Sequence, residues 1–274
     1  MAAIAGVATL TVFAATSCGT SDNSSDAKAD STPAAHASAS PQSKDKPKGA
    51  HWSYEGAAGP ANWATLEEDF EACETGREQS PVDLTEGAAV AVNKGITVDY
   101  RPVTAELVNN GHTVQATVSA GSRIVIDGVS YDLKQFHFHL PSEHTEDGHH
   151  AAMEMHFVHS DKKGNLAVLG VLMEEKTGTS AFGDLWKKLP AEEGGTAKIT
   201  EAIDLTKFLP GDRDQYRYEG SLTTPPCAEG VKWTVLKDPV QVSPAETAKY
   251  RELFPKSNRP VQPLNDRKLT VVED

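Results

Sequence analysis

Short runs of β-branched and alternating apolar residues dominate the chain from about residue 51 onward. Glycine, asparagine, aspartate and proline separate these runs, as is typical of strands joined by turns. A helical pattern is confined to two segments, residues 64–73 and 243–254. In the second, Ser243 can cap the helix, Pro244 can be its first residue and Glu246 can complete a capping box. The pattern therefore predicts a mostly β domain, with strands in residues 95–100, 112–119, 123–140, 151–159, 165–174 and 232–243.

The first 18 residues are apolar and carry no charged side chain. Residues 1–18 are too short for a comfortable bilayer span, and they end in Ala15, Thr16 and Ser17 directly before Cys18. The segment resembles a bacterial lipoprotein signal, in which the cysteine carries the lipid. We therefore expect an exported protein, either anchored at the outer face of the cell membrane or secreted or periplasmic. A short apolar helix packed on the domain is the alternative.

Residues 19–50 consist mostly of Ser, Ala, Pro, Asp and Lys, with almost no large apolar side chain. Such a segment cannot bury enough surface to offset the entropy of ordering it, so we expect a flexible tether in which His36 is solvated. Its four lysines balance its four aspartates, and the net charge of −13 therefore lies on residues 51–274. This domain has no run of basic residues, which argues against nucleic acid as a partner.

The chain has three cysteines. With Cys18 assigned to the lipid, Cys73 and Cys227 remain as an even pair in a protein exported to an oxidising compartment. We predict a disulfide between them, which would close most of the domain into one loop and contribute roughly 4 to 5 kcal/mol in the chain-entropy model. Two buried free thiols are the alternative.

Seven of the ten histidines lie between residues 135 and 159. Alternate side chains of an extended strand share a face, so His137 and His139 point one way and the phenylalanines at 136 and 138 point the other. After the polar loop at 141–148, a second strand places His156 on the face opposite to its apolar neighbours. If the two strands pair antiparallel, the three imidazoles converge.

Three neutral imidazoles at about 2.0 to 2.1 Å match a catalytic zinc site whose fourth position is left to water. Gln135 and Glu154 stand two residues before His137 and His156 on the same strand faces, where they can accept the second N–H of a ligating histidine. That pairing favours a metal site over ordinary buried histidines, although HxH pairs also occur in cupins and in iron or manganese sites. We predict that these two histidines and His139 bind one zinc ion per chain.

Four motifs contain or lie between these histidines and Cys227: QFHFH at 135–139, SEHT at 142–145, MEMHFVH at 153–159 and GSLTTPPC at 220–227. With HWSY, QSPVDL, NNGHTVQ, LAVLGV, KWTVL and NRPVQPLNDR, they resemble the α class of carbonic anhydrases over essentially the whole domain. The resemblance implies a mostly β (α+β) fold, with a large, mostly antiparallel, twisted central sheet and short peripheral helices. It also implies that residues 51–274 form a catalytic domain that interconverts CO₂ and bicarbonate.

The resemblance assigns roles to individual residues. Thr223 would accept a hydrogen bond from the attacking hydroxide and donate its own proton to an ionised Glu143, while Thr224 would lie beside bicarbonate. His112, in a solvated turn, would shuttle protons, for which an imidazole with an ordinary pKa of about 6.5 is suited. CO₂ would lie against an apolar wall made of Val158, Val168, Leu222 and Trp233.

The remaining histidines have simpler interpretations. His144 and His159 are expected to be buried and hydrogen-bonded, and His149 and His150 to be solvated in the loop. His51 could be a secondary proton relay near the entrance.

Two alternative functions belong to other classes. A catalytically silent, carbonic-anhydrase-like cell-surface binding module would typically lack a zinc histidine, and this chain has all three. A zinc esterase could use the same site, and it would be distinguished by whether CO₂ hydration far exceeds ester hydrolysis. Nothing in the sequence sets the oligomeric state.

Overall fold

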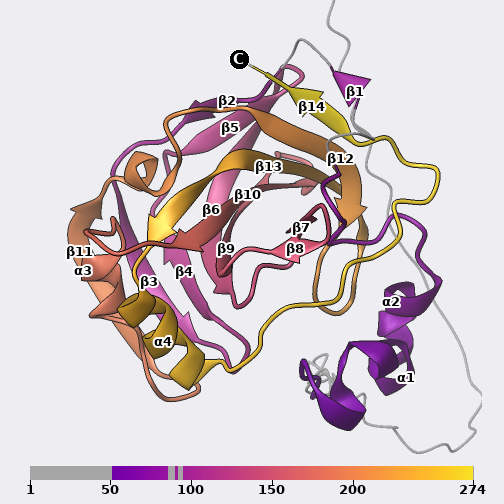
Figure 1. Ribbon diagram of the computed structural model, residues 1–274, viewed down its shortest axis with the longest axis horizontal. Helices are drawn as coiled ribbons and strands as arrows, with labels where there is room; N and C mark the ends of the chain where they lie inside the picture. Colours follow the sequence, from indigo (N-terminus) through magenta and orange to yellow (C-terminus); the bar gives the residue numbers. More distant parts are fainter. Residues whose placement is uncertain (1–50, 86–89, 92–94, 274) are drawn as a thin grey trace, which may run out of the picture. The chain divides into compact units, whose positions relative to one another are not determined.

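Strands make up most of the regular structure in the part of the chain that the computed structural model describes, residues 51–85, 90–91 and 95–273 (Figure 1). The predicted signal segment at 1–18, the tether at 19–50 and the lipidation site at Cys18 lie outside these residues. No helix within the described ranges is long and apolar enough to cross a membrane.

Twelve strands of the described residues form one large sheet (Figure 1). Its main path runs through β1 (Val90–Ala91), β14 (Thr270–Val272), β12 (Gln215–Ser221), β13 (Glu229–Val242), β10 (Leu166–Glu175), β9 (Met153–Ser160), β6 (Val129–His139), β4 (Val114–Val118), β3 (Val103–Asn109) and β11 (Thr196–Ile203). Off this path, β2 (Thr97–Asp99) pairs with β5 (Arg123–Ile126), which pairs with β6. A separate two-stranded hairpin consists of β7 (Thr145–Glu146) and β8 (His149–His150).

The prediction of a mostly antiparallel sheet is confirmed, with two parallel pairs, β10·β13 and β1·β14. Each of the six segments predicted as strands overlaps at least one observed strand. The longest predicted run, 123–140, is divided into β5 and β6 because Asp127 and Gly128 turn the chain with φ angles of 51° and 85°. Strands β1, β3, β7, β8, β11, β12 and β14 were not predicted.

The predicted helix near the C-terminus is confirmed in detail. Helix α4 (Pro244–Leu253) starts after the N-cap Ser243, whose hydroxyl accepts the N–H of Glu246. The Glu246 carboxylate in turn accepts the main-chain N–H of Ser243 at 2.8 Å, which completes the capping box.

The prediction of one continuous helix over residues 64–73 is wrong. Glu67 is extended (φ −149°, ψ 150°) and interrupts the helical backbone. A lone ten-residue helix is marginal, and the like charges of Glu67 and Glu71, four residues apart, would destabilise it further. The segment is instead part of a series of short helical turns over residues 56–75: η1 (Gly56–Ala58), η2 (Pro60–Asn62), α1 (Trp63–Leu66), η3 (Glu68–Phe70) and α2 (Ala72–Thr75).

The two faces of the central strands bury different residues, as the alternation predicts. On one face, Phe136 and Phe138 of β6 pack in a large apolar core with Trp186 and Tyr250. Trp186 and Tyr250 come from α3 (Gly183–Trp186) and α4; η5 (Leu205–Phe208) contributes to the same core. The other face of β6 presents its histidines, which therefore lie away from the helices.

The predicted disulfide is present. Cys73 and Cys227 are bonded across a sequence separation of 154 residues, so the alternative of two free thiols is excluded. The bond is buried in a small apolar cluster with Tyr54, Trp63 and Phe70. It ties the N-terminal turns to the loop that follows β12, where the predicted catalytic threonine is located.

Candidate metal centre

Three histidines converge on one face of the β6·β9 pair. The strands are antiparallel, and His137 lies directly opposite His156 in the register. The ring of His139 lies 5.0 Å from that of His137 and 4.5 Å from that of His156, centroid to centroid. One ligand nitrogen from each ring can be chosen so that all three lie within 4.8 Å of one another. The structure thus brings together the three residues that strand parity predicted.

Each of the three rings uses one nitrogen for a hydrogen bond to a protein acceptor. Because amide, carbonyl and carboxylate oxygens only accept, the bonded nitrogen carries the proton, and the other nitrogen of a neutral ring keeps a free lone pair. The three bonds are His137 Nδ1 to Gln135 Oε1 at 2.8 Å, His139 Nδ1 to the Ser257 carbonyl at 2.6 Å and His156 Nε2 to Glu154 Oε1 at 2.9 Å.

The lone pairs fit a metal cation. Burial lowers the pKa of each of these histidines, to about 3 for His139, so all three are neutral near pH 7. Nε2 of His139 is buried and has no hydrogen-bond partner among the described residues. A buried acceptor without a partner is costly, and a bound cation would satisfy it. Three imidazole nitrogens with an open fourth position suit zinc.

Glu154 supports this arrangement through the hydrogen bonds that its carboxylate accepts. One carboxylate oxygen accepts bonds from His144 at 2.7 Å and from His156, and the other accepts the main-chain N–H groups of Glu143 and His144, both at 2.9 Å. Although burial opposes it, the histidine contacts keep the pKa of the Glu154 carboxyl well below its ordinary value. Glu154 is therefore an ionised acceptor that fixes the ring of His156.

Glu143 is the second buried carboxyl group beside the histidines. Its Oε1 accepts the main-chain N–H of Arg259 at 2.8 Å. Its Oε2 lies 3.5 Å from His139 Nε2 and has no hydrogen-bond partner among the described residues. Burial raises the pKa of Glu143 well above its ordinary value, although the Arg259 N–H and the nearby Thr223 hydroxyl act to lower it. Glu143 thus has one oxygen occupied and one oxygen available on the side of Thr223.

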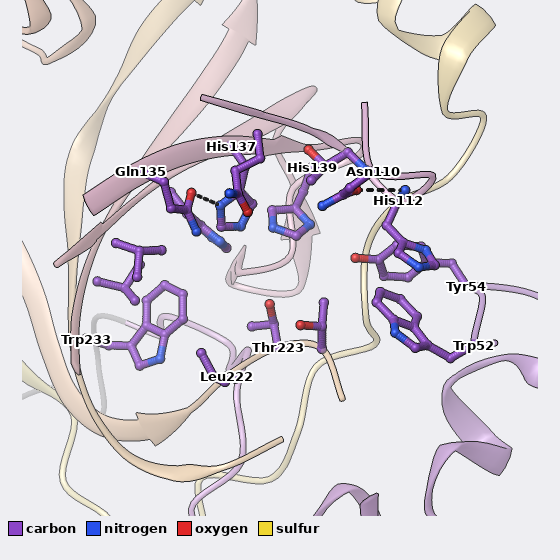
Figure 2. Close-up of a pocket in the computed structure, with 16 residues that line it drawn as sticks. Trp52, Tyr54, Asn110, His112, Gln135, His137, His139, Leu222, Thr223 and Trp233 are labelled. Carbon is purple, nitrogen blue, oxygen red and sulfur yellow. Dashed lines mark hydrogen bonds between the residues drawn. The ribbon is translucent and has the colours of Figure 1, made fainter. Parts of the chain in front are cut away.

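A cavity of about 150 Å³ opens above the histidines (Figure 2). Figure 2 shows Trp233 and Leu222 at one end and Trp52, Tyr54 and His112 at the other, with Thr223 between them. All five residues predicted to contact the substrate line this cavity: Val158, Val168, Leu222, Thr224 and Trp233.

His112 lies at the mouth of the cavity, in the turn between β3 and β4. Gly111 adopts φ 85°, and the Asn110 side chain accepts the N–H of His112 at 3.0 Å. The imidazole stacks on Trp52 with centroids 3.6 Å apart, and the ring of His51 lies 6.3 Å away. His112 is therefore half-buried, not fully solvated as predicted, because Trp52 covers one face of its ring. Burial and His51 lower its pKa below the ordinary value.

The other histidines match their predicted surroundings. His144 and His159 are fully buried, and His159 Nε2 accepts the Tyr100 hydroxyl at 2.9 Å. His149 and His150 are exposed as predicted, but they form strand β8 and not a loop.

Sequence reasoning missed three contacts of the site: the Ser257 carbonyl on His139, the Trp52 ring on His112 and the Arg259 N–H on Glu143. Of these three contacts, only that of Trp52 could have been suspected from the sequence, because Trp52 stands beside His51 in the HWSY motif.

Comparison with known proteins gives a family match over nearly all of the described domain. A family model for eukaryotic-type carbonic anhydrase matches residues 58–273. The chain is 43% identical to a carbonic anhydrase of Klebsiella pneumoniae over 220 residues, which cover 79% of this chain and 89% of that protein. It is 40% identical to a carbonic anhydrase of Nostoc sp. over 225 residues, covering 80% and 85%.

The fold is also similar to solved structures. One is the α-carbonic anhydrase from Thermovibrio ammonificans in complex with the inhibitor sulfanilamide, at a TM-score of 0.79 and 44% sequence identity. The match covers 81% of this chain and 100% of that one.

Proposed function

The chain belongs to the eukaryotic-type, α-class carbonic anhydrase family and is a carbonic anhydrase, and we propose that it interconverts CO₂ and bicarbonate with one zinc ion bound by His137, His139 and His156. One observation carries the proposal. Each of the three rings has one nitrogen committed to a fixed acceptor and the other nitrogen directed at a common point, and at that point the buried Nε2 of His139 has no partner among the described residues.

The histidines would hold the ion, and their partners would hold the histidines. When bound, zinc supplies the Lewis acidity that yields hydroxide from water near neutral pH, a chemistry for which carbonic anhydrases are the usual example. Gln135, the Ser257 carbonyl and Glu154 fix the tautomer and orientation of each ring, and such partners typically matter for affinity or activity by about 10- to 100-fold.

Thr223 and Glu143 would orient the attacking hydroxide. The Thr223 hydroxyl donates its proton to the free oxygen of Glu143, which leaves the threonine oxygen able only to accept. It would then accept a hydrogen bond from the attacking hydroxide and so direct a hydroxide lone pair at the carbon of CO₂. This role requires Glu143 to be ionised. Burial raises the pKa of Glu143 and opposes that state, the Arg259 N–H and the Thr223 hydroxyl favour it, and a bound dication would favour it further.

An apolar wall would hold CO₂ for this attack. CO₂ has no net charge or dipole, so a protein can bind it only by excluding water from an apolar surface beside the hydroxide. Val158, Val168, Leu222 and Trp233 supply such a surface next to Thr223, and Thr224 offers a hydroxyl beside the product.

His112 would export the proton that each turnover releases. It lines the mouth of the same cavity, and one of its ring nitrogens can take a proton from water in the cavity and release it to solvent. The stacked ring of Trp52, 3.6 Å away between centroids, restricts the orientation of the imidazole. His51, 6.3 Å away, would be the next acceptor along this route.

Metal analysis of a ligand variant tests the proposal directly. His139→Ala should lose zinc and CO₂ hydration together, because two imidazoles do not complete the site. His159→Gln is the matched control, since it changes a different fully buried histidine, on β9, and should keep one zinc per chain and full activity. Stoichiometric zinc in an active His139→Ala enzyme would overturn the ligand assignment.

We also propose that the enzyme works outside the cytoplasm, held by a lipid on Cys18 through the tether at 19–50. The apolar segment at 1–18 and the small residues before Cys18 support this localisation. The disulfide supports it independently, because disulfides persist in oxidising compartments and are rare in the cytosol.

A further inference from the structure

A buried arginine connects the N-terminal turns to the candidate site. Arg259 is 2% exposed, and no carboxylate among the described residues lies within 4.0 Å of its guanidinium. Its charge is instead solvated by uncharged oxygens and by the ring of Trp63, 5.6 Å from the guanidinium carbon. The acceptors, each at 2.8 Å, are Gln79 Oε1, the Ser80 carbonyl and the Cys73 carbonyl.

The main chain of the same residue contacts the site. The N–H of Arg259 donates to Glu143 Oε1 at 2.8 Å. Just before it, the Ser257 carbonyl accepts from His139, and Asn258 donates to the Ser142 carbonyl at 3.3 Å. Residues 257–259 therefore run along residues 139–143, and the guanidinium fixes one end of this contact.

Burying a charged guanidinium is expensive, and an apolar side chain of similar length would fill the same space at lower cost. The three short bonds define the position of Arg259 more tightly than apolar packing would, because planar donors and carbonyl acceptors are directional. That precision is relevant here, since a carboxylate can rotate. With Oε1 bound to the Arg259 N–H, Oε2 is directed toward Thr223 and His139.

We propose that Arg259 is a positioning residue for the reaction: its guanidinium, held by the N-terminal segment, keeps its own N–H against Glu143 and so keeps the other Glu143 oxygen aligned with Thr223. The inference rests on the roles proposed above for Glu143 and Thr223. It makes the N-terminal turns part of the catalytic architecture, although they contribute no side chain to the metal.

Two substitutions test the proposal in the zinc-loaded enzyme. Arg259→Met retains the apolar stem and removes all three bonds, and Arg259→Lys retains the charge and can reach one or two of the acceptors. We expect kcat/KM for CO₂ hydration to fall by roughly tenfold in the methionine variant, with partial rescue in the lysine variant. Zinc should remain at one per chain, because Ser257 is fixed independently by its bonds to Leu140.

A double-mutant cycle separates positioning from general destabilisation. Thr223→Ala should lower kcat/KM by about 100-fold, because it removes the group that orients the hydroxide. If Arg259 acts through Glu143 and Thr223, then Arg259→Met should cost nothing further in the Thr223→Ala background. A second, independent tenfold loss there would overturn the positioning role. An unchanged rate in Thr223→Ala alone would instead overturn the proposed function of Thr223.

Arg267 provides the matched control. Its guanidinium also donates to main-chain carbonyls, including that of Gln79 at 2.8 Å, but it makes no contact with Glu143. Arg267→Met should lower the melting temperature and leave kcat/KM unchanged. If Arg259→Met does not fold, the same cycle is run with Arg259→Lys. If Arg259→Lys lowers kcat/KM by the same factor in the wild-type and Thr223→Ala backgrounds, the proposal is again overturned. A loss of kcat/KM seen only in the background that retains Thr223 would support it.

Discussion

Reduction of the Cys73–Cys227 disulfide should destabilise the domain strongly, because the bond closes a very long loop. The two cysteines are 154 residues apart, so the bond limits the freedom of most of the unfolded domain. In the chain-entropy model a loop of this length corresponds to about 5 kcal/mol at 25 °C. For a domain of this size, each kcal/mol moves the melting temperature by about 2 to 4 °C. We therefore expect a decrease of roughly 10 to 20 °C.

The reduced protein should nevertheless fold at room temperature. Both sulfurs lie in an apolar cluster with Tyr54, Trp63 and Phe70, and two thiols can occupy that cluster without charge. The carbonyl of Cys227 accepts from Gln79 Nε2 at 3.0 Å, and its N–H donates to the Thr224 carbonyl at 2.9 Å. These bonds do not depend on the disulfide, so the loop that carries Thr223 has other restraints at low temperature.

The assay compares melting of oxidised protein with protein reduced in denaturant and refolded, after free thiols have been counted. The double variant Cys73→Ser, Cys227→Ser provides a second measurement without reductant. A shift below about 3 °C with two free thiols per domain would contradict the loop-closure reasoning, because it would mean that the unfolded chain gains little freedom when the bond is removed.

Three further predictions concern proton transfer, acid stability and localisation. His112→Ala should lower kcat by about tenfold or more and leave kcat/KM nearly intact, because the proton leaves after CO₂ is attacked. Added imidazole should restore kcat. An equal fall in kcat and kcat/KM without rescue would assign His112 a structural role. Burial lowers the pKa of His159 to about 3, whereas the same histidine in the unfolded chain titrates near 6.5. The free energy of unfolding should therefore fall as the pH drops below about 6.5, by at most ~1.4 kcal/mol per pH unit. In urea unfolding, His159→Gln should lose less stability than wild type between pH 7 and 5. Identical losses would show that the buried His159 is not the cause of the pH dependence. Cys18→Ser should release an active enzyme from the membrane fraction, and mass spectrometry that finds Cys18 unmodified in wild-type protein would exclude the anchor.

The elements that could be predicted are those whose signal is local. Alternation over QFHFH and MEMHFVH places histidines and phenylalanines on opposite faces whatever the neighbours are, and the structure confirms both strands. The capping box of α4 is complete within four residues. By contrast, β11 lies at the sheet edge and exposes most of its side chains, so its composition shows no clear alternation.

Contacts of the site were predictable only when a side chain at short spacing made them. Gln135 and Glu154 were identified from a spacing of two in a strand. The partner of His139 is a main-chain carbonyl 118 residues away, and every residue carries a carbonyl, so no sequence signal distinguishes Ser257. The N–H of Arg259 on Glu143 is hidden for the same reason. Sequence reasoning therefore finds the groups that do the chemistry more readily than the main-chain groups that hold them.

The charges buried around the three imidazoles explain why the site suits a dication together with a hydroxide. Burial keeps the imidazoles neutral, so the fixed charges are the Glu154 carboxylate and the Arg259 guanidinium, which balance each other. Burial also raises the pKa of Glu143 well above its ordinary value, because ionisation would add a second buried negative charge. The proposed dication would offset that charge and favour the ionised Glu143 that the proposed orientation of the hydroxide requires. With the dication, ionised Glu143 and one hydroxide the charges sum to zero, so the proposed reactive form is also the balanced one.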